Sequence, residues 1–236
     1  MVELRALSIP DKDSDDGWER LLPFVPPEKR ERIRRFARPA DARRTLAGEL
    51  LVRAGLMRRY GLANRDIRFR LGAHGKPELE TPGRDHFNVS HSGAWVVAAF
   101  SKVGPVGVDV ERIRPVDMAL ARRFFSADEC EALLALAGAE QTALFFRYWT
   151  LKESYLKALG SGLSKPLSSF SIRFDGDAIA LHEGGRRLSG FAFRSYDLDA
   201  GHKLALCATE PGLPSAPDLC DWSTLGRAFD PARDAL

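Results

Sequence analysis

The spacing of hydrophobic residues alternates between stretches with a period of two, typical of strands, and stretches with a period near 3.6, typical of helices. The period of two predicts strands at residues 2–9, 67–71, 86–90, 94–100, 106–111, 169–174, 178–182, 189–196 and 203–209. The helical period predicts helices at residues 26–36, 41–60, 117–125, 127–137 and 141–159. Such a mixture indicates an α+β fold with small antiparallel sheets.

The predicted elements fall into two comparable groups. Residues 1–104 form a first half and residues 105–236 a second half, and each half has helices packed on a few antiparallel strands. No repeat is visible in the sequence, so a duplication would show only in three dimensions. The tail after Glu210 is rich in proline and polar residues. We expect it to lie on the surface, either packed or loose.

Composition narrows the class of protein only a little. The 236 residues are 44% hydrophobic and 28% charged, which is typical of a globular protein, and the net charge is +3. This small excess suits an acidic partner or a polyanionic ligand, but the dense basic stripe with aromatics of a nucleic-acid binder is missing. We find no apolar run for a signal peptide or a membrane span. Three cysteines without CxxC spacing argue for a reducing cytoplasm.

The segment VGVDVER is the first candidate for chemistry. In a strand, Val106, Val108 and Val110 share one face, while Asp109 and Glu111 share the other, roughly 7 Å apart. The valines fit a core, and the two carboxylates are close enough to share a cation. The alternative is that the carboxylates form the solvated face of an edge strand.

The segment RYWTLKESYLKALG supplies a third carboxylate on a helix that ends at Gly160. Trp149, Glu153 and Lys157 are one turn apart along one side of this helix. A Glu–Lys pair at this spacing is usually a surface pair, but here it lies in an aromatic-rich stretch that we expect to be half buried. Three carboxylates without clustered Cys or His favour magnesium over zinc.

Two polar turns are the next candidates. FNVSHSG places Ser90 and His91 in an expected turn between strands, where hydroxyls, an imidazole and backbone N–H groups can hold a phosphate. The alternatives are a serine hydrolase, disfavoured by the absence of a G-x-S-x-G motif, and an ordinary polar turn. HGKPEL presents Lys76 on a rigid turn. Lys29, Arg32 and the Arg43–Arg44 pair add cations that, taken singly, are typical of a solvated surface.

Together these motifs resemble one family, the 4'-phosphopantetheinyl transferases of the Sfp-like, surfactin-synthetase-activating type. The resemblance rests on PPEKRERIRRF, DARRTLAGELLVR, HGKPEL, FNVSHSG, VGVDVERI, RFFSADE and YWTLKESYLKALGSGL in this order, and more weakly on LSSFSIRF and HKLALCA. It covers most of residues 20–210. It implies a pseudo-dimer of two similar α+β halves, a monomer in solution, with coenzyme A bound between the halves.

The resemblance also implies a role for each matched residue. Asp109, Glu111 and Glu153 correspond to the magnesium ligands, and Lys157 to a lysine near the transferred phosphate. Ser90 and His91 correspond to positions that hold the coenzyme A phosphates, with His91 at the ribose 3'-phosphate. The remaining nucleotide-binding positions correspond to Lys29, Arg32, Thr45, Gly75, Lys76 and Pro77.

The implied reaction is attack by a serine of an apo acyl or peptidyl carrier protein on the β-phosphate of coenzyme A, which releases adenosine 3',5'-bisphosphate. Glu153 is the candidate base, directly or through a water, and Lys157 would assist the leaving phosphate. The resemblance implies carriers of secondary metabolism but leaves the acceptor open. The rival interpretations are a magnesium phosphodiesterase and a non-catalytic module that binds coenzyme A or a carrier protein.

Overall fold

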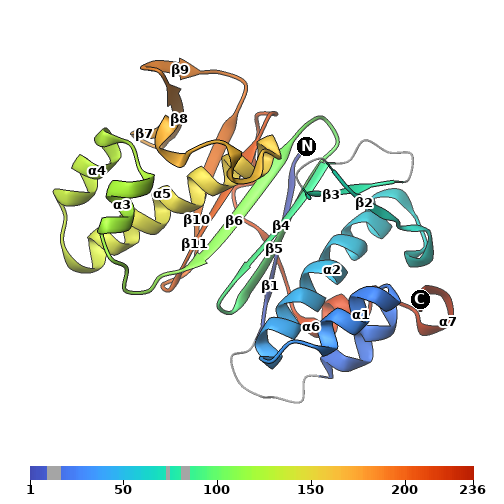
Figure 1. Ribbon diagram of the computed structural model, residues 1–236. Helices are drawn as coiled ribbons and strands as arrows, with labels where there is room; N and C mark the ends of the chain where they lie inside the picture. Colours follow the sequence, from blue (N-terminus) through green and yellow to red (C-terminus); the bar gives the residue numbers. More distant parts are fainter. Residues whose placement is uncertain (10–16, 73–74, 81–85) are drawn as a thin grey trace.

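The computed structural model describes residues 1–9, 17–72, 75–80 and 86–236, which form small sheets with helices packed against them (Figure 1). The first half is built on a four-stranded sheet of order β12-β1-β5-β4. Its strands are β1 (Glu3–Ser8), β4 (His86–Ser92), β5 (Trp95–Ser101) and β12 (Asp218–Cys220). The long helix α2 (Pro39–Tyr60) covers one face of this sheet.

Smaller elements surround α2 on the side away from the second half. Helix α1 (Pro27–Arg34) packs against it, and the hairpin of β2 (Phe69–Leu71) and β3 (Pro77–Leu79) lies near its C-terminal end. Two short 3-10 helices, η1 (Trp18–Phe24) and η2 (Asn64–Asp66), complete this layer. The layer leaves room for a pocket beside α1 and α2.

The second half repeats the plan with a three-stranded sheet of order β10-β11-β6. Its strands are β6 (Val106–Arg112), β10 (Ala192–Asp199) and β11 (His202–Ala208). The covering helix is α5 (Gly138–Leu159). The flanking elements are α3 (Ala119–Phe124), α4 (Ala127–Leu134), η3 (Gly162–Ser164), η4 (Leu167–Ser169), and the sheet of β7 (Phe170–Asp175), β8 (Ala178–Glu183) and β9 (Arg186–Leu188).

The two halves are alike in their main elements. In each, antiparallel strands are covered by one helix of 22 residues that ends at a glycine in the left-handed region, Gly61 or Gly160. Glycine suits this position because a Cβ atom disfavours positive φ. The predicted α+β fold of two similar halves is confirmed.

Among the described residues, three hydrophobic cores hold this arrangement together. One lies between α2 and its sheet, and another between α5 and its sheet. The third lies where the two sheets pack on each other, and it includes Val97 of β5, Leu206 of β11 and Val108 of β6. The alternation predicted for β6 is therefore confirmed, because Val106, Val108 and Val110 all enter this third core.

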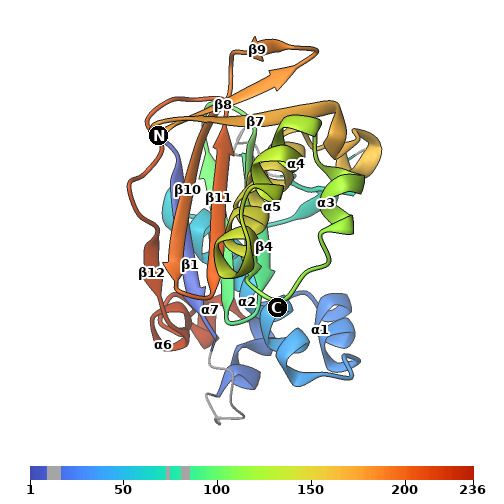
Figure 2. The same ribbon diagram turned by 90° about the vertical axis from the view of Figure 1, so that its left-hand side faces the viewer.

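The tail after Glu210 returns from the second half to the first. Strand β12 pairs in parallel with β1, and α6 (Trp222–Gly226) and α7 (Pro231–Asp234) follow it (Figure 2). Trp222, Leu225 and Phe229 are buried in the core of the first half. The tail is thus packed rather than loose. The division of the chain between residues 104 and 105 stays a prediction.

Two local predictions are wrong. Ser90, His91 and Ser92 do not lie in a turn, because β4 continues through Ser92 in register with β5 and the turn begins at Gly93. The helix predicted at residues 41–60 begins two residues earlier, at Pro39. Proline suits the first helical position, where its missing N–H costs no hydrogen bond. Within the described ranges, no helix is both long and apolar enough to cross a bilayer.

Candidate active site

The packing of α5 on β6 builds the site. Gly107 lies directly under the helix, where a Cβ atom would overlap backbone atoms of Ser154 and Ala158. Because Gly107 has no side chain, the helix comes close enough to cover the face of β6 that carries the carboxylates. This contact brings Glu153 and Lys157 of α5 beside Asp109, so the three predicted side chains gather at one place.

Asp109 is buried beneath α5 rather than solvated, with only 4% of its surface exposed. Its Oδ1 accepts hydrogen bonds from Lys157 Nζ at 2.7 Å and from Ser90 Oγ at 2.9 Å, and Lys157 also donates to Ser90 Oγ at 3.0 Å. Burial raises the pKa of the Asp109 carboxyl, and the Lys157 ammonium opposes that rise. Among the described residues, its buried Oδ2 has no partner. This oxygen is available to a ligand.

The other two predicted metal ligands flank Asp109. Glu153 is half buried, and its pKa is raised first by this burial and then by the negative charge of Asp109, while Lys157 opposes the rise. Glu111 accepts hydrogen bonds from Ser92 Oγ at 2.8 Å and from Arg114 at 3.3 Å. In the part of the chain that the structure describes, no three His, Cys, Asp or Glu side chains already stand in metal-binding geometry.

A row of polar side chains on β4 joins the two halves at this point. Strands β4 and β6 lie side by side (Figure 1) but belong to different sheets. Side chains of β4 accept hydrogen bonds from backbone N–H groups of β6 in three pairs: Asn88 with Val108 at 2.9 Å, Ser90 with Val110 at 3.4 Å, and Ser92 with Arg112 at 3.1 Å. The seam formed by Asn88, Ser90 and Ser92 fixes β6 beside β4.

Sequence reasoning missed Asn88 and Ser92 in this role. The signal was present, because three polar residues at i, i+2 and i+4 of one strand predict a polar face. Treating SHSG as a turn obscured it. Ser90 thus faces the carboxylates and Lys157, whereas its neighbour His91 faces the opposite side of the strand.

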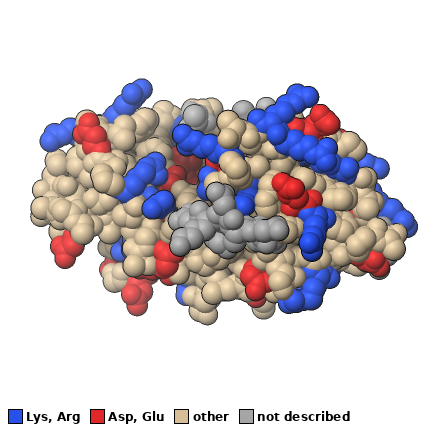
Figure 3. Space-filling model, turned by 90° about the horizontal axis from the view of Figure 1, so that it is seen from below, with Lys and Arg blue, Asp and Glu red and all other residues tan. Residues whose placement is uncertain are grey.

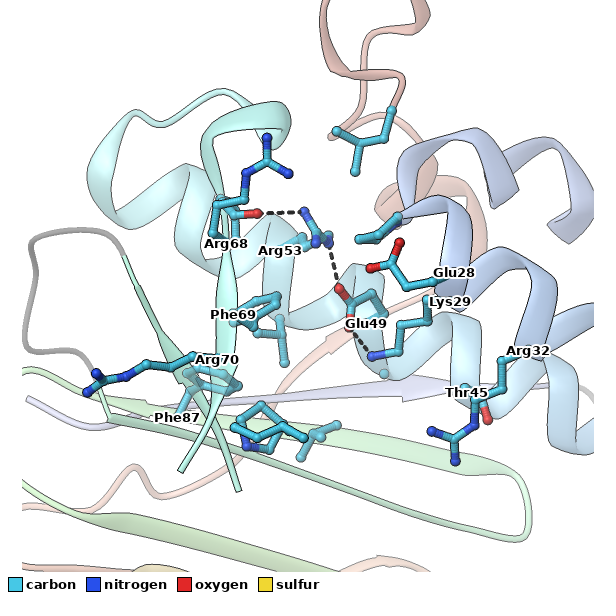
Figure 4. Close-up of a pocket in the computed structure, with 18 of the residues that line it drawn as sticks. Glu28, Lys29, Arg32, Thr45, Glu49, Arg53, Arg68, Phe69, Arg70 and Phe87 are labelled. Carbon is cyan, nitrogen blue, oxygen red and sulfur yellow. Dashed lines mark hydrogen bonds and ion pairs between the residues drawn. The ribbon is translucent and has the colours of Figure 1, made fainter. Parts of the chain in front are cut away.

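A pocket of about 810 Å³ lies on that opposite side, between α1, α2, the β2–β3 hairpin and β4 (Figure 4). Five of the predicted cofactor-binding residues line it: Lys29, Arg32, Thr45, Pro77 and His91. The structure also describes the other three predicted residues, and they do not line the pocket: Gly75, Lys76 and Ser90. The structure therefore places five of the eight predicted residues in this pocket and Ser90 at the carboxylate cluster.

Among the described residues that line the pocket, cations outnumber anions. Its lining contains Lys29, Arg32, Arg44, Arg53, Arg68 and Arg70, against Glu28, Glu49 and Glu80. Figure 3 shows basic side chains around a central hollow in which acidic side chains are visible. Apolar groups such as Ile67, Phe69 and Val89 make up much of the remaining wall. A ligand with several negative charges and an apolar ring would match both parts.

His91 and Arg44 line the part of the pocket beside β4. Arg44 donates to the carbonyl of Gly93 at 2.9 Å and to Asp41 at 2.6 Å, which fixes its guanidinium beside β4. Although the edge of His91 reaches solvent, loss of water around the ring lowers its pKa below 6.5, and the Arg44 cation lowers it further. An anion bound here would offset the Arg44 charge and so raise the pKa of His91.

Lys76 connects the β2–β3 hairpin to α5. Its Nζ donates to the carbonyl of Lys157 at 2.7 Å and to the carbonyl of Val106 at 3.2 Å. The first of these belongs to the last turn of α5, where carbonyls lack intrahelical partners. Burial lowers the pKa of Lys76 to about 8. In this structure its ammonium supports α5 and β6.

A lysine–carboxylate cluster on one face of β4 and a pocket lined with cations on the other suit an enzyme that acts on a phosphorylated substrate. Comparison with known proteins gives the family. Residues 105–207 match the 4'-phosphopantetheinyl transferase superfamily, and residues 12–103 match the family described as 4'-phosphopantetheinyl transferase, N-terminal. The chain belongs to the 4'-phosphopantetheinyl transferase superfamily, and the predicted enzyme class is confirmed.

Two named relatives align with most of the chain, and a solved structure aligns with less than half of it. The 4'-phosphopantetheinyl transferase Sfp of Bacillus subtilis (strain 168) is 44% identical over 85% of this chain and 89% of its own length. The 4'-phosphopantetheinyl transferase gsp of Aneurinibacillus migulanus is 34% identical over 88% of this chain and 86% of its own. A holo-(acyl-carrier-protein) synthase from Bacillus anthracis, solved with CoA (3',5'-ADP), covers 44% of this chain and 92% of its own at 17% identity, with a TM-score of 0.37.

Proposed function

We propose that the protein transfers 4'-phosphopantetheine from coenzyme A to a serine of an apo acyl or peptidyl carrier protein and releases adenosine 3',5'-bisphosphate. The observation that carries the proposal is the position of Ser90 and His91. They are neighbours on β4, yet Ser90 contacts the Asp109–Lys157 pair while His91 lines the cation-rich pocket. A donor that binds in the pocket can therefore extend its pyrophosphate across β4 to the carboxylates.

The pocket supplies the binding part of the mechanism. Lys29, Arg32 and His91 would hold the phosphates of the adenosine 3',5'-bisphosphate portion, with the hydroxyl of Thr45 as an additional donor. The apolar wall around Ile67 would take the adenine ring. Of the turn Gly75–Lys76–Pro77, Pro77 would contribute to the nucleotide site, and the Lys76 side chain donates a hydrogen bond to the last turn of α5.

Asp109, Glu111 and Glu153 fit a magnesium ion. All three are carboxylates, the buried Oδ2 of Asp109 lacks a partner among the described residues, and Glu111 and Asp109 both add to the rise in the Glu153 pKa. Asp109 and Glu111 both disfavour the charged form of Glu153, and a bound cation would offset this repulsion. When bound, Mg²⁺ would neutralise the pyrophosphate and the charge that develops on the leaving phosphate.

Protons are handled by the two residues of α5. A serine hydroxyl becomes nucleophilic when a base removes its proton, and Glu153 is half buried with a raised pKa, as suits a general base. Lys157, now bonded to Asp109 and Ser90, lies one helical turn away and would donate a hydrogen bond to the transferred or leaving phosphate. The new bond joins the serine oxygen to the β-phosphorus, and the leaving phosphate takes the electron pair of the broken bond.

Intact-mass spectrometry of apo carrier proteins tests the proposal. The purified protein is mixed with coenzyme A, Mg²⁺ and a panel of acyl and peptidyl carriers, and each carrier is weighed. We expect a gain of one phosphopantetheine that disappears when the metal is chelated. Hydrolysis of coenzyme A without a modified carrier would favour a phosphodiesterase. Tight binding without either reaction would favour a binding module. The monomeric state and the cytoplasmic location stay predictions.

A further inference from the structure

The segment 231–236 forms part of the pocket although it belongs to the end of the tail. Leu236 lines the pocket, and α7 packs against η1 and η2 (Figure 1). The backbone N–H of Leu236 donates to the carbonyl of Pro23 at 2.7 Å, and its carbonyl accepts from Arg30 Nη2 at 2.7 Å. The Leu236 backbone is therefore held on both sides, beside α1.

The carboxylate of Asp234 is buried and bonded to the loop that follows α2. Asp234 is 1% exposed and Asn64 is fully buried. Asp234 Oδ1 accepts the N–H of Asn64 at 3.2 Å, and its backbone carbonyl accepts Asn64 Nδ2 at 2.6 Å. Its Oδ2 accepts the N–H of Asp230 at 2.9 Å. Both carboxylate oxygens are thus engaged, and one of them holds the Asn64 backbone. The Asn64 side chain is held by the backbone carbonyls of Asp234 and of Phe24, the second at 2.9 Å.

Asn64 in turn holds the buried cation of the pocket wall. Arg53 donates to Asn64 Oδ1 at 3.1 Å and to the Asn64 carbonyl at 3.2 Å, and its Nε donates to Glu49 Oε1 at 2.7 Å. The second oxygen of Glu49 pairs with Lys29. Figure 4 shows Arg53, Glu49 and Lys29 in a continuous line of interactions along the wall. Of these, Lys29 is the most open to the pocket, with 34% of its side chain exposed.

We propose that Asp234 is a positioning residue for donor binding, and that Leu236 forms part of the wall that receives the nucleotide. This rests on the proposed function, in which the pocket holds the nucleotide of coenzyme A. Asp234 acts through Asn64, Arg53 and Glu49 to keep the Lys29 ammonium in place before the donor arrives. A cation ordered in advance binds phosphate more tightly than one that must be ordered on binding.

The contacts that lead from Asp234 through Asn64, Arg53 and Glu49 to Lys29 form a relay. Calorimetric titration of the full chain with adenosine 3',5'-bisphosphate tests this relay. We expect Asp234→Asn, which keeps the shape but loses the charge and one acceptor, to raise Kd by about fivefold to tenfold. The kcat at saturating coenzyme A should stay within about twofold of wild type, because the carboxylate cluster is untouched. The matched control is Asp218→Asn, an exposed tail carboxylate paired with Arg5, which should leave Kd unchanged.

The outcomes separate the two proposals. If the wild type bound no nucleotide and modified no carrier, the proposed function would fail. Suppose instead that the wild type binds the nucleotide and modifies a carrier. If the Asp234→Asn variant then folds and binds the nucleotide with the same Kd as wild type, Asp234 does not position Lys29, even if the Tm of the variant is lower. If the Asp234→Asn variant does not fold, Leu236→Ala tests the pocket wall and leaves the residues of the relay unchanged. We expect it to raise Kd about threefold with an unchanged Tm, and an unchanged Kd overturns the role of the segment.

Discussion

Gly107 of β6 lies so close to Ser154 of α5 that any side chain at residue 107 would overlap the helix backbone. Backbone atoms cannot move aside without shifting the whole helix. We expect Gly107→Ala to destabilise the fold by about 1–3 kcal/mol or more. Because Glu153 and Lys157 move with α5, transfer should fall by far more than stability alone predicts. Denaturant unfolding and the carrier-modification rate measure the two effects.

Gly226 of α6 provides the control for this substitution. A Cβ there would meet only Leu21 at 3.6 Å, an ordinary contact. We expect Gly226→Ala to change stability by no more than about 0.5 kcal/mol and to leave transfer unchanged. Equal effects of the two alanines would contradict the close packing of α5 on β6.

Replacing Glu153 with glutamine should separate chemistry from binding. The amide keeps the size of the side chain but cannot take a proton, so kcat should fall by about 10²–10⁴-fold. The Kd for adenosine 3',5'-bisphosphate should change by less than about twofold, because the pocket lies on the other face of β4. Glu140→Gln, in the exposed first turn of the same helix, is the matched control. A Glu153→Gln enzyme with normal kcat would remove the base from the mechanism.

His91 should make donor affinity depend on pH. In the free protein its pKa is lowered, first by partial loss of water around the ring and then by the Arg44 cation. A bound 3'-phosphate favours the charged imidazole and raises that pKa, so binding takes up a proton. The affinity for coenzyme A should therefore rise as pH falls below 7. Titrations of coenzyme A and 3'-dephospho-coenzyme A from pH 5.5 to 8 measure this.

Dephospho-coenzyme A is the internal control for His91. It lacks the 3'-phosphate, so its affinity should be nearly independent of His91 protonation. We expect His91→Ala to raise Kd for coenzyme A about tenfold and to abolish the difference in pH dependence between the two ligands. Equal losses for both ligands would show that His91 contacts another part of the donor.

Lys76 should make stability depend on pH in the alkaline range. Its pKa is about 8 in the fold and near 10.5 when unfolded, because burial disfavours the charge. Between these values the unfolded chain holds the proton and the folded chain does not, so stability rises with pH. We expect the stability of wild type relative to Lys76→Met to increase by about 1–2 kcal/mol from pH 8 to 10.5. Denaturant unfolding across this range measures it, and a flat or falling difference would place Lys76 in water.

Much of the site could be predicted from local spacing. The period of two in VGVDVER placed Val106, Val108 and Val110 in a core and Asp109 on the other face, and the structure agrees. Helical spacing likewise put Glu153 and Lys157 one turn apart. These inferences hold because periodicity depends on backbone geometry within a single element.

The features of the site that could not be predicted depend on contacts between segments that are distant in the sequence. The burial of Asp109 follows from Gly107 meeting a helix that lies nearly fifty residues later, a distance over which spacing carries no information. The seam residues Asn88 and Ser92 find their partners on β6 only because two sheets meet at that edge. Lys76 was predicted at the nucleotide, and its bond to the carbonyl of Lys157 required knowledge of where α5 ends.

The return of the tail has a consequence for the order of folding. Strand β1 leaves the ribosome well before its parallel neighbour β12 and the buried Trp222, which are made only after the whole second half. Contacts this far apart in sequence close late, since a long loop must be ordered first. The first half therefore completes its core after the second half has been synthesised. During translation, the α5–β6 unit can mature before the donor pocket does.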